Sequence, residues 1–162
     1  MNVKKLLRDI DIVHKVFQKK FPVLHWSESF QENLKNSFTY LDFTKVDEAI
    51  NNLLTWTNKN LSLTEHITHE NHPIAIISIF HYKFLNEIHP FANGNGRIAR
   101  LLTTLLLLKR NYPPALIKAE ERQQYFQTLI QTEKEKNFDY IITFIGERIL
   151  EAMEKRIKSK KV

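Results

Sequence analysis

Apolar residues recur every three or four positions through most of the chain, which is the spacing of one face of an α-helix. Near the N-terminus this face comprises Leu6, Leu7, Ile10, Val13 and Phe17. A second stripe comprises Val46, Ile50, Leu53, Leu54 and Trp56, and a third comprises Ile74, Ile77, His81, Phe84, Leu85 and Ile88. The pattern therefore predicts an all-α fold.

Prolines, caps and polar runs divide this pattern into separate helices. Pro22 closes the first helix, and Ser27 is a candidate N-cap for a short helix over 27–38. Thr44 is the candidate cap of the next helix, which gives way to a polar connector over about 57–71. Further helices are predicted over 73–88, 95–110, 118–134 and 137–158, while 38–43 is ambiguous between an extended segment and a hairpin edge.

The length of 162 residues suits one domain, and no repeat or internal linker divides it. We expect a single domain over 1–162, with its core at about 45–150, N-terminal helices over 1–44 and a basic helix end over 151–162. The most apolar run, Leu101–Leu108, is far shorter than the ~20 residues that a membrane span needs. We therefore expect no membrane partner.

The chain has no cysteine, which excludes a disulfide scaffold, thiol catalysis and cysteine-ligated zinc. Charged residues interrupt the first nine positions, so the N-terminus does not resemble a secretory signal peptide. Both features favour a cytoplasmic location.

The formal net charge of +6 favours acidic partners such as nucleotides, nucleic acid or anionic membranes. Much of the excess is near the C-terminus, at Lys155, Arg156, Lys158, Lys160 and Lys161. Cations suit the C-terminal end of a helix, so a solvated helix end is the favoured interpretation. Nucleic-acid binding is the alternative, and no other feature of the chain supports it.

Two of the three glycines, Gly94 and Gly96, flank Asn95 just before a predicted helix. Glycine is required where the backbone takes a positive φ or where a ligand approaches it closely. The first amides of a helix also have no partner within that helix. A turn of this kind at a helix N-terminus forms a cradle for phosphate.

Three further residues give this corner the composition of a catalytic site. Arg97 and Arg100 are three positions apart, so they share a helix face and can flank an anion. His89 precedes the loop and suits a general base at neutral pH. Together they indicate phosphoryl or nucleotidyl transfer. We expect Phe91 to point into the core and His81 to be a hydrogen-bonded core histidine.

Other motifs fit the chain less well. The string Gly94–Ala99 matches a dinucleotide fingerprint, but that motif needs a preceding strand and the periodicity here is helical. No glycine is followed by the Lys and Ser/Thr of a phosphate-binding Walker loop. His66, His69 and His72 invite a metal site, yet no acidic metalloprotease pattern accompanies them. A corner with glycines only for turning is the plain structural alternative.

Residues 89–100 resemble the signature of the Fic/Doc family, H-x-F-x-[D/E]-G-N-G-R-x-x-R, with Asn93 at the position that is usually acidic. The helix from His72-Pro73 to His89, and the stretch through Tyr112-Pro-Pro114, Arg122, Tyr125 and Phe138–Ile145, resemble that family as well. The resemblance implies a compact helical bundle with a central helix–loop–helix active-site motif. It also implies a short β-hairpin flap that docks the target, for which 38–43 is the candidate.

The family resemblance implies a protein adenylyltransferase that moves AMP from ATP to a Ser, Thr or Tyr hydroxyl of a target protein. His89 would be the general base, and Gly94, Asn95 and Gly96 would hold the phosphates, with the Asn95 side chain assisting. Arg97 would bind the β- or γ-phosphate, and Arg100 the γ-phosphate or an inhibitory glutamate. Tyr125, with Phe126, would line the adenine pocket.

Asn93 is the departure from the family pattern. The acidic residue there binds Mg²⁺ or Mn²⁺ in the family, and an amide oxygen lacks the charge that hard cations prefer. Three interpretations stay open: a transferase with weaker metal binding, an enzyme with an altered donor, and a catalytically weak nucleotide-binding module or toxin component.

The family resemblance leaves inhibition open. The family's inhibitory helix reads [S/T]-x-x-x-E-[G/N], and the nearest string here, Glu28–Asn33, has Glu where Ser or Thr belongs. A surface helix face is the simpler interpretation of that string. A separate antitoxin and a homodimer are the other partners that the resemblance suggests.

Overall fold

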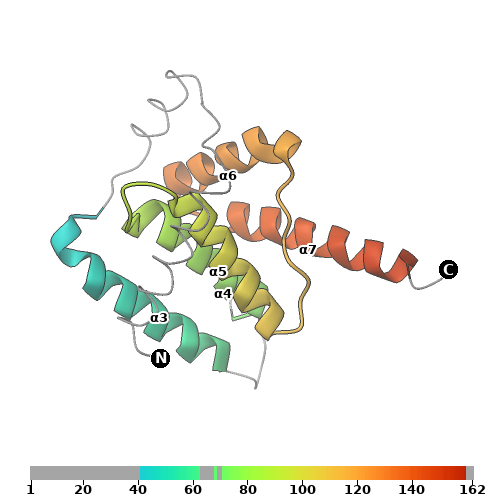
Figure 1. The fold of residues 1–162 in the computed structure, drawn as a ribbon, viewed down its shortest axis with the longest axis horizontal. Helices are drawn as coiled ribbons and strands as arrows, with labels where there is room; N and C mark the ends of the chain where they lie inside the picture. The colour runs from blue at the N-terminus through green and yellow to red at the C-terminus, as the bar shows by residue number, and fades with distance from the viewer. Residues whose placement is uncertain (1–40, 63–67, 69–70, 160–162) are drawn as a thin grey trace.

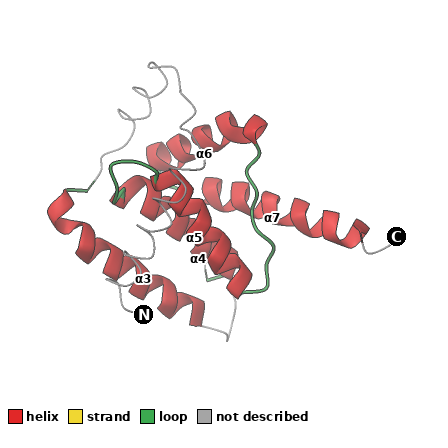
Figure 2. Ribbon diagram, viewed as in Figure 1, coloured by secondary structure: helices red, strands yellow, loops and turns green. Residues whose placement is uncertain are grey.

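The computed structural model describes residues 41–62, 68 and 71–159, which form helices joined by loops (Figures 1 and 2). The main helices are α3 (Val46–Ser62), α4 (Pro73–Tyr82), α5 (Asn95–Lys109), α6 (Arg122–Glu135) and α7 (Asp139–Ser159). Three short elements accompany them: 3₁₀ turns η1 (Phe43–Lys45) and η3 (Ala119–Glu121), and the π-helix η2 (Lys83–Ile88). No strand occurs within the described residues, so the all-α prediction is confirmed.

Helix α4 is the centre of the bundle and contacts α3, α5 and α7, while α6 packs against α7 (Figure 1). Seven of its ten residues are buried, which is typical of a helix surrounded by others. Pro73 occupies the first turn, where its missing N–H costs nothing. His72 caps the helix, because its Nδ1 accepts a hydrogen bond from the Ile74 N–H at 3.2 Å.

The predicted helix over 73–88 is present, but its last six residues form π-helix η2 rather than α-helix. The His89 N–H donates to the Phe84 carbonyl at 3.1 Å, five residues back. A π turn is wider than an α turn and fits one extra residue into it. Phe84, Leu85, Asn86 and Ile88 are all buried, so burial in this segment extends beyond the predicted face of Phe84, Leu85 and Ile88.

Helix α3 extends to Ser62, into the predicted connector, so the start of that connector at about Thr57 was wrong. Thr57 and Leu61 are both buried and continue the apolar face to Ser62. The Thr57 hydroxyl donates a hydrogen bond to the Leu53 carbonyl at 2.7 Å. This bond offsets the free-energy cost of burying the hydroxyl. At the other end, Asp42 rather than Thr44 is the capping residue, since its carboxylate accepts from the Thr44 N–H at 2.8 Å.

The C-terminal helices follow the predicted order with small shifts. Pro113 and Pro114 separate α5 from the rest, and the helix expected from Lys118 begins with the 3₁₀ turn η3 before α6. An ion pair between Glu121 and Arg148, at 3.1 Å, ties this turn to α7. Helix α7 extends beyond the body of the bundle toward the C-terminus (Figure 1).

Some expectations fall outside the described residues, including the N-terminal helices, Glu28–Asn33, His66, His69, Lys160 and Lys161. Of the proposed flap, 38–40 is also outside. Its described part, 41–43, forms no strand and leads into η1, and the Leu41 N–H donates to the Glu87 carbonyl at 3.1 Å. No helix among the described residues combines the length and apolarity required to cross a bilayer.

Adjacent leucines of α5 provide a test of the core. Leu107 is fully buried and Leu108 is 54% exposed. We expect Leu107→Ala to lower the free energy of unfolding by about 3 kcal/mol, because it leaves a cavity. Leu108→Ala, the matched control, should lower it by less than about 1 kcal/mol. Chemical denaturation measures both, and equal losses would contradict the packing described here.

Candidate active site

A sharp corner joins η2 to α5, and its two ends have left-handed backbone conformations. His89 has φ 48° and ψ 58°, and Gly94 has φ 85° and ψ 4°. Proline at position 90 disfavours the α conformation for His89, so the helix ends there as predicted. A non-glycine residue with positive φ is uncommon and is frequent at functional sites. Both ends of the corner are therefore strongly constrained.

The side chain of Asn95 holds this corner closed. The Phe91 N–H donates to Asn95 Oδ1 at 3.0 Å, and Asn95 Nδ2 donates back to the Phe91 carbonyl. Asn95 is only 2% exposed, and Phe91 packs against the core as expected. Both polar atoms of the amide are thus engaged by the loop backbone. The Asn95 side chain therefore fixes the shape of the loop that leads into α5.

Gly96 lies in the first turn of α5 without a positive φ. A Cβ atom there would lie 3.4 Å from an Arg100 guanidinium nitrogen and 3.9 Å from Leu85, and both are ordinary van der Waals distances. Gly96 therefore lies directly beside Arg100 at the helix N-terminus, and neither its backbone conformation nor its protein neighbours require a glycine.

The ring of His89 has a defined orientation and protonation pattern. Its Nδ1 lies 2.7 Å from the Leu85 carbonyl, which can only accept, so Nδ1 carries the proton. In the neutral ring Nε2 is then the proton acceptor. Partial burial lowers the pKa of His89 below its ordinary value, against the opposing effect of the Leu85 hydrogen bond. The neutral form needed for a base is thereby favoured.

A cavity of about 260 Å³ opens beside the corner. It brings together most of the predicted site residues. Its lining comprises Leu85, Asn86, His89, Ala92, Asn93, Gly94, Asn95, Gly96, Arg100, Tyr125, Phe126 and Leu129. Arg97 is the exception: it is half-buried on the first turn of α5 but does not line this cavity.

The aromatic wall of the cavity comes from α6. Tyr125 is 1% exposed, and its ring centroid lies 5.3 Å from that of the half-buried Phe126. The positive charge comes from Arg100, with Arg122 close by: burial and the nearby Arg100 charge both lower the pKa of Arg122. The cavity thus combines an apolar wall with cations, as a nucleotide requires.

Asn86 is a cavity residue that the sequence pattern did not indicate. It is 5% exposed, and its amide nitrogen makes no hydrogen bond of standard geometry among the described residues, although the Tyr82 hydroxyl lies close by. Asn86 and Leu85 are neighbours in the π-helix η2, and both line the cavity. The one signal in the sequence was the position of Asn86, three residues before His89. Helical periodicity gives no reason to select it, because it is a polar residue outside the apolar face.

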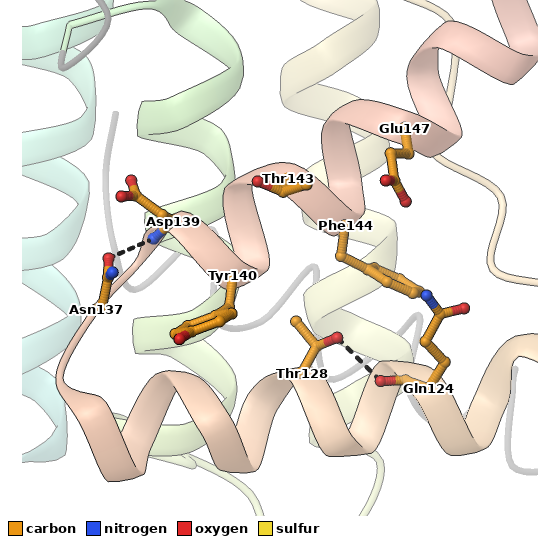
Figure 3. Close-up of a pocket in the computed structure, with 8 residues that line it drawn as sticks. All are labelled: Gln124, Thr128, Asn137, Asp139, Tyr140, Thr143, Phe144 and Glu147. Carbon is orange, nitrogen blue, oxygen red and sulfur yellow. Dashed lines mark hydrogen bonds between the residues drawn. The ribbon is translucent and has the colours of Figure 1, made fainter.

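A larger cavity, about 390 Å³, is lined by residues of α6, of α7 and of the loop between them (Figure 3). Its lining comprises Gln124, Thr128, Asn137, Asp139, Tyr140, Thr143, Phe144 and Glu147. Figure 3 shows Thr128 bonded to Gln124 and Asp139 bonded to Asn137. Two carboxylates and no cation make it a poor site for phosphate, so size does not identify the active site here.

The comparisons with known proteins agree with this geometry. The model of the Fic/DOC family matches residues 6–107, more than half of the chain. The chain belongs to the Fic/DOC family. The resemblance seen in the signature over 89–100 is therefore confirmed, and the corner described above is the signature region of a Fic domain.

Named relatives match about half of the chain. "Protein adenylyltransferase Fic" of Aedes aegypti is 38% identical over 76 residues, 47% of this chain and 15% of that protein. "Protein adenylyltransferase fic-1" of Caenorhabditis elegans is 35% identical over 92 residues, 57% of this chain and 17% of that protein. The chain thus spans less than a fifth of the length of these relatives.

A solved structure shares the fold. A Fic domain containing signaling protein from Bacteroides thetaiotaomicron aligns with a TM-score of 0.58 and 26% identity. The alignment covers 69% of this chain and 44% of that protein. The all-helical architecture predicted for a Fic domain is therefore confirmed.

Titration of His89 tests the electrostatics of the corner. We expect a pKa below the ordinary value of about 6.5, because burial disfavours the charged ring. NMR of the ring protons would measure it, with His89→Gln identifying the resonance and the protein in concentrated urea as the reference. A His89 pKa above that of the unfolded chain would contradict the buried, neutral ring.

Proposed function

We propose that this chain transfers AMP from ATP to a Ser, Thr or Tyr hydroxyl of another protein. The observation that carries the proposal is the shared cavity, in which the proton-accepting side of His89 accompanies the N-terminus of α5 and Arg100. The named adenylyltransferase relatives support both ATP as the donor and a protein as the acceptor.

In the proposed reaction His89 Nε2 accepts the proton of the target hydroxyl as its oxygen attacks the α-phosphorus of ATP. A bond forms between that oxygen and the α-phosphorus, and the bond from the α-phosphorus to the bridging oxygen breaks. Pyrophosphate leaves with the electron pair. The Leu85 carbonyl stabilises the protonated ring that results, because it accepts the Nδ1 hydrogen bond throughout.

The phosphates would bind at the N-terminus of α5. The first N–H groups of a helix have no carbonyl partners within it, and the helix dipole favours negative charge there. Gly94, Asn95 and Gly96 all line the cavity at this end. Arg100 would contact the terminal phosphates, and Arg97, on the same turn, would approach them from outside the cavity wall. Tyr125 and Phe126 would pack against the adenine.

The residues at the cavity fit a magnesium ion only weakly. Asn93 is exposed and offers one neutral amide oxygen, and no Asp or Glu is present among the described lining residues. Mg²⁺ prefers carboxylates and phosphate oxygens. Bound Mg²⁺ would neutralise charge on the phosphates, and here those phosphates would supply most of its ligands.

A catalytically weak nucleotide-binding module is the second candidate function. The neutral side chain of Asn93 favours it, since a poorly held metal reduces transfer while leaving ATP binding in place. Intact-mass spectrometry after incubation with ATP, Mg²⁺ or Mn²⁺ and cell lysate would separate the two functions. Transfer adds AMP to a protein, and mere binding leaves every mass unchanged.

Removing the base tests the proposed reaction. His89→Ala should lower transfer of label from α-labelled ATP by at least about 100-fold, the usual contribution of a general base. ATP affinity, measured on the same variant by calorimetry, should change little because the phosphate cradle is intact. Transfer that survives in His89→Ala would rule out His89 as the base.

Restoring the acidic residue tests the metal site. Asn93→Asp should lower the Mg²⁺ concentration for half-maximal transfer by about tenfold, because a carboxylate binds the ion more strongly than an amide. Asn137→Asp, which makes the same change in the other cavity, is the matched control and should have no effect. An unchanged Mg²⁺ dependence in Asn93→Asp would show that this position does not contact the metal.

A further inference from the structure

A line of buried hydrogen bonds begins in the interior and ends at the cavity. His81 is 1% exposed, and both of its ring nitrogens are engaged, so the prediction of a hydrogen-bonded core histidine is confirmed. Nδ1 lies 2.8 Å from the Thr103 hydroxyl, and Nε2 lies 2.6 Å from the Tyr125 hydroxyl. Thr103 and Tyr125 are themselves 4% and 1% exposed.

The donors and acceptors along this line have one consistent direction. The Thr103 hydroxyl donates its single proton to the Ala99 carbonyl at 2.7 Å, so it accepts from His81 Nδ1. The Ala99 carbonyl, which also interacts with His81, can only accept. The proton of the neutral ring is therefore on Nδ1, and Nε2 accepts from the Tyr125 hydroxyl.

Tyr125 then has only acceptor capacity left, and it faces a donor. Arg100 and Tyr125 line the same cavity, and the guanidinium, by its charge and by hydrogen bonding, opposes the rise that burial causes in the pKa of the Tyr125 hydroxyl, so the two groups lie within reach of each other. Arg100 also lines the cavity beside the N-terminus of α5. The line thus has the order Arg100, Tyr125, His81, Thr103 and the Ala99 carbonyl, with each member donating to the next.

We propose that Tyr125, supported by His81 and Thr103, is a positioning residue that orients Arg100 toward the terminal phosphates of the nucleotide without neutralising its charge. The inference rests on the proposed function, because it assigns Arg100 to a triphosphate. It also assigns the Tyr125 hydroxyl a different partner from the adenine, which contacts the ring instead.

The absence of charge along the line is what distinguishes it from a salt bridge. Burial lowers the pKa of His81 to about 3 and raises that of Tyr125 to about 12, so both are neutral near pH 7. A carboxylate would also orient a guanidinium, but it would offset the positive charge in a site of low dielectric. A neutral acceptor leaves the charge of Arg100 for the phosphate.

The test compares two nucleotides that differ only in the terminal phosphates. In wild-type protein with Mg²⁺, ATP should bind more tightly than AMP by calorimetry. Tyr125→Phe keeps the ring and removes the hydroxyl. We expect it to lower ATP affinity by about tenfold, in line with the loss of a hydrogen bond to a charged group, and to change AMP affinity by less than about twofold.

Tyr140→Phe is the control. It makes the same change at a tyrosine whose hydroxyl donates to Glu135 and which lines the other cavity, not the one beside the corner. Both affinities should stay unchanged in this variant. Thr103→Val removes the hydroxyl at the far end of the line with little change in volume, and it should lower ATP affinity by about threefold. It keeps the proposal testable if Tyr125→Phe folds poorly.

A double-mutant cycle closes the test. In an Arg100→Ala background, Tyr125→Phe should cause no further loss of ATP affinity, because its effect acts through the arginine. Two results would overturn the positioning role. One is that Tyr125→Phe lowers the affinities for ATP and AMP equally, and the other is that it lowers ATP affinity as much in the Arg100→Ala background as in the wild-type protein. If wild-type protein binds AMP as tightly as ATP, the phosphate cradle of the proposed function fails instead.

Discussion

The pair of hydrogen bonds between the Asn95 side chain and the Phe91 backbone is the interaction on which the candidate site depends. It ties the loop after His89 to the first residue of α5, so the base and the helix N-terminus keep a fixed separation. Because Asn95 is buried, water does not compete for these bonds and they are correspondingly strong. Without them, the turn would be held against α5 only by the packing of Phe91 and by the hydrogen bonds from the α5 backbone to the Gly94 carbonyl.

The electrostatic character of the site follows from what surrounds this corner. Arg100 and Arg122 lie close enough to affect one another, and the described lining of the cavity contains no carboxylate. The partners of the base and of the arginine are neutral groups. The Leu85 carbonyl accepts a hydrogen bond from His89, and the Tyr125 hydroxyl lies beside Arg100. Such a site has a positive potential that a triphosphate offsets on binding.

Much of the site could be predicted because its chemistry is local in sequence. His89, Gly94, Gly96 and Arg100 lie within twelve positions, and the glycine spacing before a helical stripe indicates a phosphate cradle directly. The central helix was equally predictable, since Pro73 marks its start and Pro90 its end. In both cases the determining residues are neighbours in the chain.

The features that sequence reasoning missed depend on contacts distant in sequence or on backbone register. Tyr125 bonds to His81 across 44 positions, which no periodicity reveals. The hydrogen bonds between the Asn95 side chain and the loop backbone were not foreseen, and Asn86 was overlooked because it is not part of the predicted apolar face. Arg97 has the expected charge and spacing, yet it does not line the cavity, to which α5 contributes Asn95, Gly96 and Arg100.

The wide turn of η2 has a consequence for how this chain tolerates changes in length. An extra residue in a regular α-helix rotates everything after it by about 100° and would swing the histidine away from its loop. A π turn takes up one residue within a single turn and leaves the elements on either side in place. Deleting one residue of 83–88 would therefore return the segment to α-helix with His89 still facing α5. The number of residues between Pro73 and His89 can thus change by one without displacing the histidine.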